Sequence, residues 1–300
     1  MLKIAYHPIY KHPLPDGHRF PMIKYDLLPQ QLLYEGTCEK DNFFEPQFPD
    51  DKHILAIHDQ VYFEELKNLQ IKPSAARKIG FPLSTELVQR ECIIADGTIK
   101  GCEFALENGI AMNIAGGTHH AYSNRGEAFC MLNDQAIGAR YLKSNGLANK
   151  ILIVDLDVHQ GNGTAEIFQG DNSVFTFSIH GAANYPFKKE ISDLDIPLEK
   201  NTDDKTYLRI LRATLPELIA KVSPDFIFYL CGVDILASDK LGTLGMTLEG
   251  CYERDRYVLQ TCKDLNLPVQ CSMGGGYSPD IKIIVEAHAN TFRLAQQIFF

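Results

Sequence analysis

The sequence has no run of lysine or arginine, and its 38 acidic residues outnumber its 29 basic ones, which gives a formal net charge of −9. This balance excludes the tight, phosphate-driven binding of a nucleic-acid-binding protein, although it mildly favours cationic ligands. No apolar run approaches the roughly 20 residues that cross a bilayer. The N-terminal residues Met1–Tyr6 become polar too soon for a signal peptide. We therefore expect a cytoplasmic protein that contacts neither nucleic acid nor membrane directly.

Cysteine pairs with metal-site or redox spacing are also absent, because none of the eight cysteines forms a C-x-x-C motif. Most of them lie in apolar or helical stretches, which is typical of reduced, buried thiols in a cytoplasmic protein. The chain further lacks internal repeats, low-complexity segments and an evident linker. We therefore expect residues 1–300 to form a single domain, and a chain of this length can build a large core.

What the sequence does contain is an alternation of short apolar runs and longer helical patterns. The runs Ile151–Asp155 and Phe226–Cys231 are apolar at successive positions, which is typical of strands that are buried on both faces. Similar runs predict further strands at Leu2–Tyr6, Ile54–Ile57, Ala111–Ile114, Val174–Ile179 and Val269–Met273.

Helical patterns lie between these strands, and the segments Lys11–Pro21 and Lys72–Pro82 are predicted to be loops because they carry many prolines. A kink or break is expected at Pro216. The alternation predicts an α/β fold with a mostly parallel sheet covered on both sides, and ligands on such sheets bind beyond the carboxyl ends of the strands. The predicted helices are Ser84–Asn108, Asn133–Asn145, Thr202–Val222, Thr247–Asn266 and Pro279–Phe300.

Polar residues at the end of the run Ile151–Asp155 have a spacing suited to metal binding. Asp155, Asp157 and His159 lie two positions apart, so an extended backbone projects all three to one side. Three such groups at the end of a buried strand are costly to bury unpaired, and a metal ion or a dense hydrogen-bond network removes that cost. A polar strand end open to solvent is the alternative from this segment alone.

Three further polar segments follow other predicted strands. Gly116–His120 carries adjacent histidines in a glycine-rich turn, Tyr229–Asp234 ends in an acid, and Ser272–Tyr277 places a tyrosine after three glycines. Each segment alone also fits an ordinary turn. Together the four segments supply one histidine and two aspartates for a metal, two more histidines and a phenol. That set is complete for metal-assisted hydrolysis of an amide.

The chain resembles the histone deacetylase family, which includes acetylpolyamine amidohydrolases and acetoin-utilisation proteins. The resemblance runs from His18 to Tyr277 and rests on Gly-Gly-Thr-His-His, Asp-Leu-Asp-Val-His-Gln-Gly-Asn-Gly, Gly-Val-Asp and Gly-Gly-Gly-Tyr. The segments Gln160–Gly163 and Asp239–Gly242 look most like the class IV, deacetylase-11-like branch and its bacterial relatives. The family implies an arginase-like α/β domain with a central, mainly parallel eight-stranded sheet.

The resemblance implies a metal site and an oxyanion donor. Asp157, His159 and Asp234 match the family's zinc ligands, although an oxygen-rich set of this kind also suits Fe(II) or Co(II). Tyr277 matches the phenol that binds the substrate carbonyl. The implied reaction is removal of an acetyl or longer acyl group from the side-chain amine of a lysine in a peptide or protein.

The resemblance also implies separate roles for the two adjacent histidines. His120 matches the general base that deprotonates water and then protonates the leaving amine, while His119, oriented by Asp155, tunes the electrostatics. Asn162 stands beside His120 where many family members carry a second aspartate. A neutral amide fixes the ring but stabilises an imidazolium less than a carboxylate does, so we hypothesise a lowered pKa for His120.

Other matching residues line the implied substrate channel. Phe129 and Tyr185 match its aromatic walls, Leu241 matches an apolar rim position, and Gly275 lies in the motif that borders the substrate. Leucine at the rim favours an acylated lysine over a polyamine. Arg19 matches a basic residue of the internal acetate-release region. Implied structural potassium or sodium sites comprise an inner set, Asp155, Asp157, His159 and Ser178, and an outer set, Phe168, Asp171 and Val174.

Three other functions fit parts of this pattern. The substrate could be a small N-acetylated amine or polyamine. An arginase-like ureohydrolase would need two manganese ions and additional Asp and His ligands. A catalytically silent acyl-lysine binder would keep the channel without turnover, although the complete catalytic set argues against it.

The Asn162→Asp variant tests the hypothesis on His120. A carboxylate beside His120 raises the pKa of the ring, so the neutral base persists only at higher pH. We therefore expect the acidic limb of the pH–rate profile to move to higher pH. The measurement is kcat/KM against pH for the wild type and the variant, and an unmoved acidic limb would contradict the hypothesis.

Overall fold

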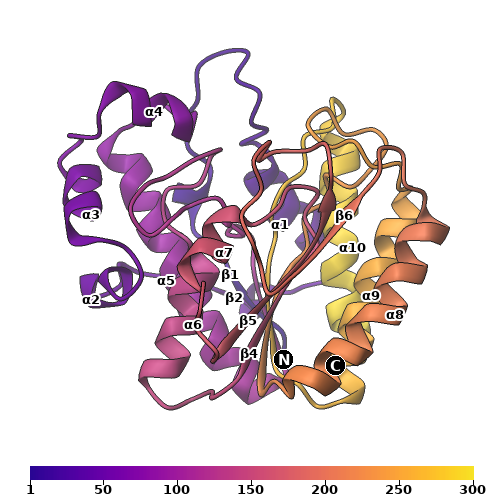
Figure 1. Ribbon diagram of the computed structural model, residues 1–300. Helices are drawn as coiled ribbons and strands as arrows, with labels where there is room; N and C mark the ends of the chain where they lie inside the picture. Colours follow the sequence, from indigo (N-terminus) through magenta and orange to yellow (C-terminus); the bar gives the residue numbers. More distant parts are fainter.

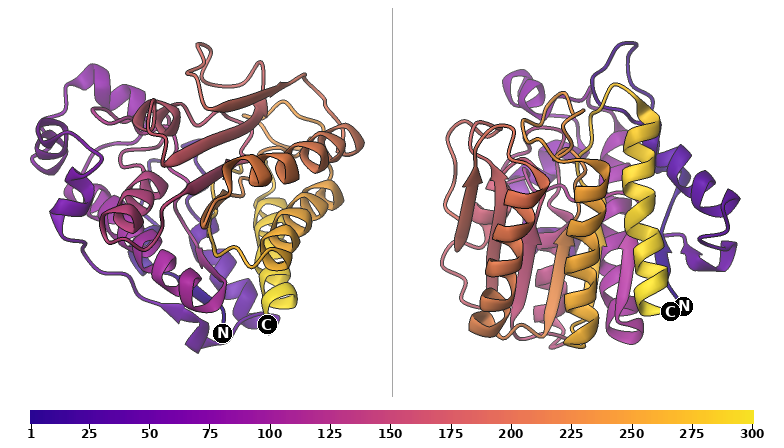
Figure 2. Two further views of the ribbon diagram at one scale, coloured as in Figure 1. Left: turned by 60° about the horizontal axis from the view of Figure 1, so that its bottom comes forward. Right: turned by 90° about the vertical axis from the view of Figure 1, so that its right-hand side faces the viewer.

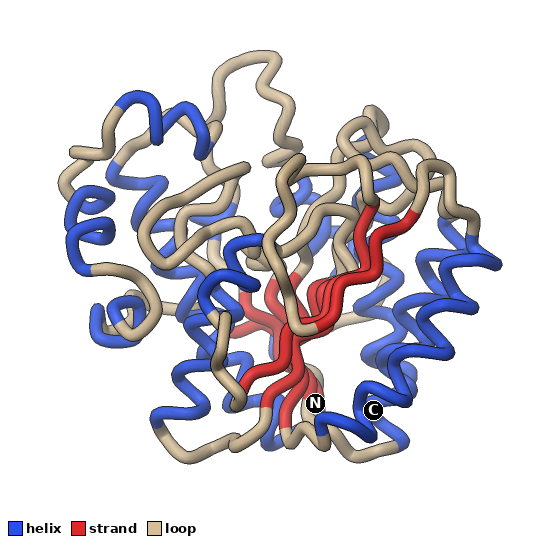
Figure 3. The backbone as a smooth tube through the Cα atoms, viewed as in Figure 1, coloured by secondary structure: helices blue, strands red, loops and turns tan.

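The computed structural model describes all 300 residues, and a sheet of eight strands runs through its centre (Figures 1 and 3). The strand order is β2-β1-β3-β8-β7-β4-β5-β6, and every neighbouring pair is parallel. The predicted α/β fold is confirmed, and the sheet is parallel throughout. The strands are β1 (Lys3–Ala5), β2 (Phe43–Phe44), β3 (Ile110–Asn113), β4 (Ile151–Asp155), β5 (Val174–Gly181), β6 (Leu194–Leu198), β7 (Phe226–Leu230) and β8 (Val269–Ser272).

Helices cover both faces of the sheet (Figure 2). Helices α8, α9 and α10 pack in a row on one face with α1 against α10, while α5 and α6 pack together on the other. No helix is long and apolar enough to cross a membrane. The helices are α1 (Lys24–Tyr34), α2 (Asp51–Leu55), α3 (Gln60–Lys67), α4 (Pro73–Ile79), α5 (Thr85–Asn108), α6 (Asp134–Ser144), α7 (Asn162–Ile167), α8 (Asp204–Val222), α9 (Leu248–Asp264) and α10 (Ile281–Phe299).

The carboxyl ends of all the strands face one edge of the sheet. The two chain termini lie close together at the opposite end of the molecule (Figures 1 and 2). Because the strands are parallel, the loops that follow β3, β8, β7 and β4 emerge side by side at the upper edge in Figure 1. This is the edge at which parallel sheets hold their ligands.

The central strands form where the sequence is most apolar. Strand β4 has the predicted bounds, and β7 ends one residue before the predicted Cys231. Every residue of both strands is buried, as expected for strands with helices on both faces. The helix predicted after Ser84 also forms, because the Ser84 side chain accepts a hydrogen bond from the N–H of Leu87 (3.1 Å) and caps α5.

Two local predictions are wrong. Ile54–Ile57 is not a strand, because α2 covers its first two residues and a turn follows; the helix begins at a cap in which Asp50 accepts a hydrogen bond from the N–H of Lys52. The predicted loop Lys72–Pro82 contains α4, which starts at Pro73. Proline is tolerated in the first turn of a helix, where its missing N–H has no helical partner, so it marks a helix start here.

The expected break at Pro216 does not occur, and two strands were not predicted. Helix α8 runs through Pro216 because buried side chains such as Leu211 and Leu215 hold it against the core. Strand β2 has two residues, and β6 includes an exposed proline, Pro197. Both lie at the edges of the sheet, where short or polar strands are common and apolar periodicity is weak.

A fully buried arginine ties the strand ends together. Arg254 on α9 donates hydrogen bonds to the carbonyl oxygens of Leu156 (3.1 Å), Gly232 (2.6 Å) and Cys231 (3.3 Å), and it pairs with Asp255 at 2.7 Å. These carbonyls belong to residues that directly follow β4 and β7. Arg254 therefore fixes the two loops that carry Asp157 and Asp234.

The Arg254→Met variant should lose about 3–5 kcal/mol in the free energy of unfolding, because it leaves the buried carboxylate of Asp255 without its cation. Arg256→Met is the matched control on the same helix. Arg256 pairs with Glu253 at the surface, so its loss should cost less than about 1 kcal/mol. Chemical denaturation measures both values, and equal losses would refute the role given to Arg254.

Candidate active site

The four polar segments predicted from the sequence meet at the carboxyl edge of the sheet. They follow β3, β8, β7 and β4, which are consecutive neighbours in the strand order. The segments Gly116–His120, Ser272–Tyr277, Tyr229–Asp234 and Asp155–Gly163 therefore come together although they are far apart in the sequence. Nearly every side chain among them that was expected to act is buried.

Asp157, His159 and Asp234 form a compact cluster of metal-competent groups. One ligand atom from each residue lies within 4.8 Å of the others. The Nδ1 atom of His159 lies 3.0 Å from Asp157 Oδ1 and 3.1 Å from Asp234 Oδ2. Two carboxylate oxygens and one imidazole nitrogen can bind a divalent ion such as Zn²⁺ and leave coordination positions open. The chemistry of this donor set fits the predicted metal.

The electrostatics of the cluster are those of a cation site. Burial disfavours a charged His159, but its hydrogen bonds with Asp157 and Asp234 outweigh burial and raise its pKa to about 10. Burial and the neighbouring Asp157 raise the pKa of Asp234. A site that holds a proton this strongly between two acids is an attractive site for a metal cation.

Glycines allow the backbone to approach these acids. The N–H of Gly275 donates to Asp157 Oδ2 at 2.8 Å, and the N–H of Val158 donates to Asp234 Oδ1 at 2.9 Å. A Cβ atom on Gly275 would lie 2.0 Å from Asp234 Oδ2. Gly275 thus packs against Asp157 and Asp234 and borders an inner cavity of the site.

Each of the adjacent histidines has its own buried partner. His119 Nδ1 lies 2.6 Å from Asp155 Oδ2, and His120 Nδ1 lies 2.6 Å from Asn162 Oδ1. The ring centroids of the two histidines are 4.1 Å apart. Because Nδ1 of each ring is occupied, Nε2 is the nitrogen left for chemistry. Asn162 also donates from Nδ2 to the hydroxyl of Tyr122 (3.0 Å), a residue that sequence reasoning missed.

The two partners give the histidines opposite charge preferences. Burial disfavours the charged form of His119, but Asp155 outweighs burial and raises its pKa. Burial and the neighbouring positive charge of His119 hold the pKa of His120 well below its usual range, and the hydrogen bond with Asn162 opposes this only in part. His120 is therefore neutral and able to accept a proton.

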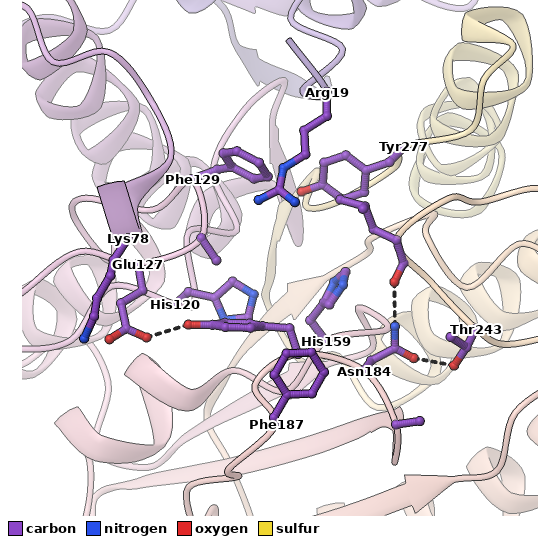
Figure 4. A pocket seen from close by; sticks show the side chains of 14 residues that line it. Arg19, Lys78, His120, Glu127, Phe129, His159, Asn184, Phe187, Thr243 and Tyr277 are labelled. Carbon is purple, nitrogen blue, oxygen red and sulfur yellow. Dashed lines mark hydrogen bonds between the residues drawn. The ribbon is translucent and has the colours of Figure 1, made fainter. Parts of the chain in front are cut away.

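A cavity of about 560 Å³ leads to this cluster (Figure 4). Phe129, Tyr185 and Leu241 line it together with His120 and His159. The ring of Tyr185 lies 4.9 Å from that of His120 at an angle of 89°. The Tyr185 hydroxyl donates a hydrogen bond to Glu127 Oε2 (2.5 Å). The three residues predicted for the channel thus border one cavity above the histidines.

Tyr277 lines the same cavity at the end of the glycine turn. Its backbone N–H donates to Asp239 Oδ2 at 2.6 Å, which fixes the turn, and its ring lies 6.3 Å from that of His159. Burial, followed by the charge of Asp234, raises the pKa of Tyr277. The phenol therefore keeps its proton and can donate a hydrogen bond beside the metal cluster.

The residues matched to the monovalent-cation sites lie in two places: the inner set at the end of β4 and on β5, and the outer set after α7. Asp155 and Ser178 border a hollow of about 10 Å³. Phe168, Asp171 and Val174 follow α7 and form a turn, in which the N–H groups of Asp171 and Val174 donate to the carbonyl oxygens of Phe168 and Asp171. The potassium or sodium sites stay predictions.

The structure corrects the placement of Arg19. Arg19 is exposed and lines the outer cavity, with its guanidinium 4.9 Å from the centre of the Phe129 ring. Two buried basic groups lie near the inner part of the site instead: Lys24, whose Nζ donates to the carbonyl oxygen of Gly274 (3.0 Å), and Arg90, which borders an inner cavity of about 40 Å³. Lys24 lies among apolar residues at the start of α1 and gave no signal in the sequence.

Comparisons with known proteins agree with this arrangement. An uncharacterized protein of Picosynechococcus is 46% identical over 296 residues, which cover 99% of both chains. Histone deacetylase 2 of Arabidopsis thaliana is 28% identical over 92% of this chain and 74% of its own length. Acetoin utilization protein AcuC of Staphylococcus aureus is 30% identical over 88% of this chain and 73% of its own.

The fold has a close structural counterpart. The crystal structure of the HDA15 HD domain superposes with a TM-score of 0.84 at 18% sequence identity, covering 99% of this chain and 88% of that one. The Histone deacetylase domain matches residues 18–292, a span that includes all four segments of the site. The chain therefore belongs to the histone deacetylase family.

Proposed function

We propose that the chain is a zinc-dependent amidohydrolase that removes acetyl or longer acyl groups from the side-chain amine of lysine. The observation that carries the proposal is the junction of three features at one cavity floor: the buried metal cluster, the neutral ring of His120 and the phenol of Tyr277. Metal-assisted amide hydrolysis needs a cation, a base and an oxyanion donor within reach of one carbonyl.

Asp157, His159 and Asp234 would hold the ion. Zinc is the proposed metal, and the oxygen-rich donor set also suits Fe²⁺ or Co²⁺. A bound divalent ion supplies Lewis-acid activation of water and of the amide carbonyl. Structural potassium or sodium ions at the two predicted sites are part of the same proposal.

His120 is the proposed general base. Its ring is neutral, and Asn162 fixes it through Nδ1, so Nε2 can take a proton from the attacking water and pass it to the leaving amine. His119 is held in the charged form by Asp155 and stabilises negative charge nearby without exchanging protons with the substrate.

Tyr277 is the proposed oxyanion donor. A donor placed where negative charge develops in the transition state contributes about 3 kcal/mol to the lowering of the barrier. The backbone of Tyr277 is fixed through Asp239, which supports a phenol that is positioned before substrate binds. A donor that is fixed in advance needs no reorganisation during the reaction.

The substrate channel supports acyl-lysine as the substrate. The methylene chain of a lysine would pass between Phe129 and Tyr185, whose rings border the cavity, and apolar Leu241 lies at the same cavity. A small N-acetylated amine is the alternative substrate. Comparison of kcat/KM on acetyl-lysine peptides, long-chain acyl-lysine peptides and acetylpolyamines separates these substrates, and binding without turnover would favour a silent binder.

We also propose a relationship to the class IV branch and a place in the cytoplasm. Gln160 of the Gln-Gly-Asn-Gly segment is buried and donates from Nε2 to Asp195 Oδ1 and to the carbonyl oxygen of Glu190, both at 2.8 Å. This residue therefore anchors the loop that contains Tyr185.

The proposed place in the cytoplasm rests on the cysteines. All eight cysteines are free and buried, which fits a reducing compartment.

Metal content tests the cluster. We expect one divalent ion per chain after dialysis against zinc, and Asp234→Ala should weaken zinc binding more than about 100-fold, because changes outside the ligand set already cost 10- to 100-fold. Asp155→Asn is the matched control: Asp155 pairs with His119 and accepts a hydrogen bond from the N–H of Asp157 (3.1 Å) but is not a proposed ligand, so this variant should weaken zinc binding by no more than about 100-fold. Two ions per chain would favour the arginase-like alternative, and equal losses in both variants would reject the ligand assignment.

The Tyr277→Phe variant tests the oxyanion donor. Loss of one such donor lowers kcat by roughly 100- to 1,000-fold. We expect that decrease on an acyl-lysine peptide while the zinc content stays at the wild-type level, because the phenol belongs to neither the metal ligands nor their N–H donors. Near-normal turnover by the zinc-loaded variant would remove Tyr277 from the mechanism.

A further inference from the structure

The mouth of the cavity carries positive charge in a chain whose net charge is −9. Arg19 is exposed, and its guanidinium stacks 4.9 Å from the centre of the Phe129 ring. In Figure 4 this guanidinium points into the space between Phe129 and the hydroxyl of Tyr277. A charged group there lies directly beside the path that a substrate takes to the metal cluster.

A second cation, Lys78, lines the same cavity from the last turn of α4. Two backbone hydrogen bonds fix this turn beside the channel wall: the N–H of Ala128 donates to the carbonyl oxygen of Lys78 (2.8 Å), and the N–H of Phe129 donates to that of Ile79 (2.6 Å). The position of Lys78 relative to Phe129 is therefore set by the fold. Its side chain is exposed.

Neither cation has a carboxylate in direct contact. Arg19 and Lys78 take part in no salt bridge, and Glu127 is the one carboxylate among the lining residues. Glu127 is already engaged, because it pairs with Arg125 at 3.0 Å and accepts a hydrogen bond from the Tyr185 hydroxyl at 2.5 Å. The remaining side chains of the outer rim are neutral: Asn184, Phe187, Leu241 and Thr243.

We propose that this mouth selects acylated amines that carry a carboxylate next to the acylated lysine, with Arg19 and Lys78 as the residues that determine specificity. The inference rests on the proposed function. The side chain of the lysine would occupy the channel, so its backbone and nearest neighbours would lie at the mouth. The carboxylate is either an aspartate or glutamate beside the lysine or the α-carboxylate of a free acyl-lysine.

The physical basis is long-range attraction together with a short-range ion pair. Cations at a cleft entrance raise the local concentration of anionic ligands, and the effect falls as salt screens the charges. An exposed ion pair changes affinity by roughly fivefold at most, so the expected preference is modest and appears mainly in kcat/KM. Substrates with lysine or arginine at the same position should be disfavoured.

Two matched substrate series test the proposal on the zinc-loaded full-length chain. The first contains one acyl-lysine peptide with Asp, Asn or Lys beside the acylated residue. The second compares free Nε-acyl-lysine with its α-carboxamide. We expect kcat/KM to be roughly fivefold higher for the carboxylate member than for the neutral one, and the ratio should fall toward one in about 0.5 M salt. The series that shows the preference identifies the source of the carboxylate.

Charge variants locate the effect. Arg19→Gln and Lys78→Gln should each lower the ratio of carboxylate to neutral substrate toward one, Arg19→Glu should invert it, and Arg19→Lys should restore it. A ratio within one variant is independent of how much of that variant folds. Arg77→Gln is the control, because Arg77 is the exposed neighbour of Lys78 and borders a different hollow.

The outcomes distinguish the two proposals. Two outcomes would overturn the role of Arg19 and Lys78 and leave the proposed reaction standing. One is turnover of the peptides without any charge preference, and the other is a charge preference that Arg77→Gln abolishes as strongly as Arg19→Gln does. Failure of the zinc-loaded chain to hydrolyse any member of either series would overturn the proposed function, and the specificity inference with it.

Discussion

Three carboxylates are buried at one edge of the sheet, and the rest of the site must compensate their negative charge. Asp155, Asp157 and Asp234 are 3%, 2% and 0% exposed, and buried negative charge is tolerated only where N–H donors or cations compensate it. Histidines and backbone N–H groups supply part of this compensation, and the proposed divalent ion would supply the rest. Such close packing needs neighbours without side chains, because a Cβ atom on Gly232 would lie 2.2 Å from Asp157 Oδ2 and one on Gly275 would lie 2.0 Å from Asp234 Oδ2.

A fourth buried carboxylate, Asp134, fixes the backbone of the turn that carries His119 and His120. Its Oδ1 atom accepts hydrogen bonds from the N–H groups of Gly117 (2.8 Å) and Thr118 (2.9 Å), which locks the turn before the histidines. Gly116 and Gly117 have φ values of 83° and 76°, a backbone conformation that glycine adopts readily. Arg254 has the corresponding role for the loops after β4 and β7. Buried polar contacts outside the cavity thus position the groups inside it.

The fold and the centre of the candidate site could be predicted because their signals are local. An apolar run that ends in Asp, His or Gly predicts a strand, and the polar residues that directly follow the run are the candidate site residues. Partners from distant segments leave no such signal: Tyr122 meets Asn162 across 40 positions, and Arg254 meets Leu156 across 98. Arg19 was placed in the interior from its motif, yet the side chain lies at the mouth, because the position of a loop depends on the surface against which it packs.

The cavity has buried acids and histidines in its interior and two exposed cations at its mouth, and the two regions are built from different parts of the fold. The acids of the interior follow strands whose every residue is buried, so the core constrains their positions. Arg19 lies on a loop and Lys78 on the short helix α4, both outside the sheet. Exposed loops and short helices tolerate substitutions that strand ends do not. In the proposed function, residues at the ends of the strands would carry out the reaction, while the exposed cations Arg19 and Lys78 would select among the acylated amines that reach them.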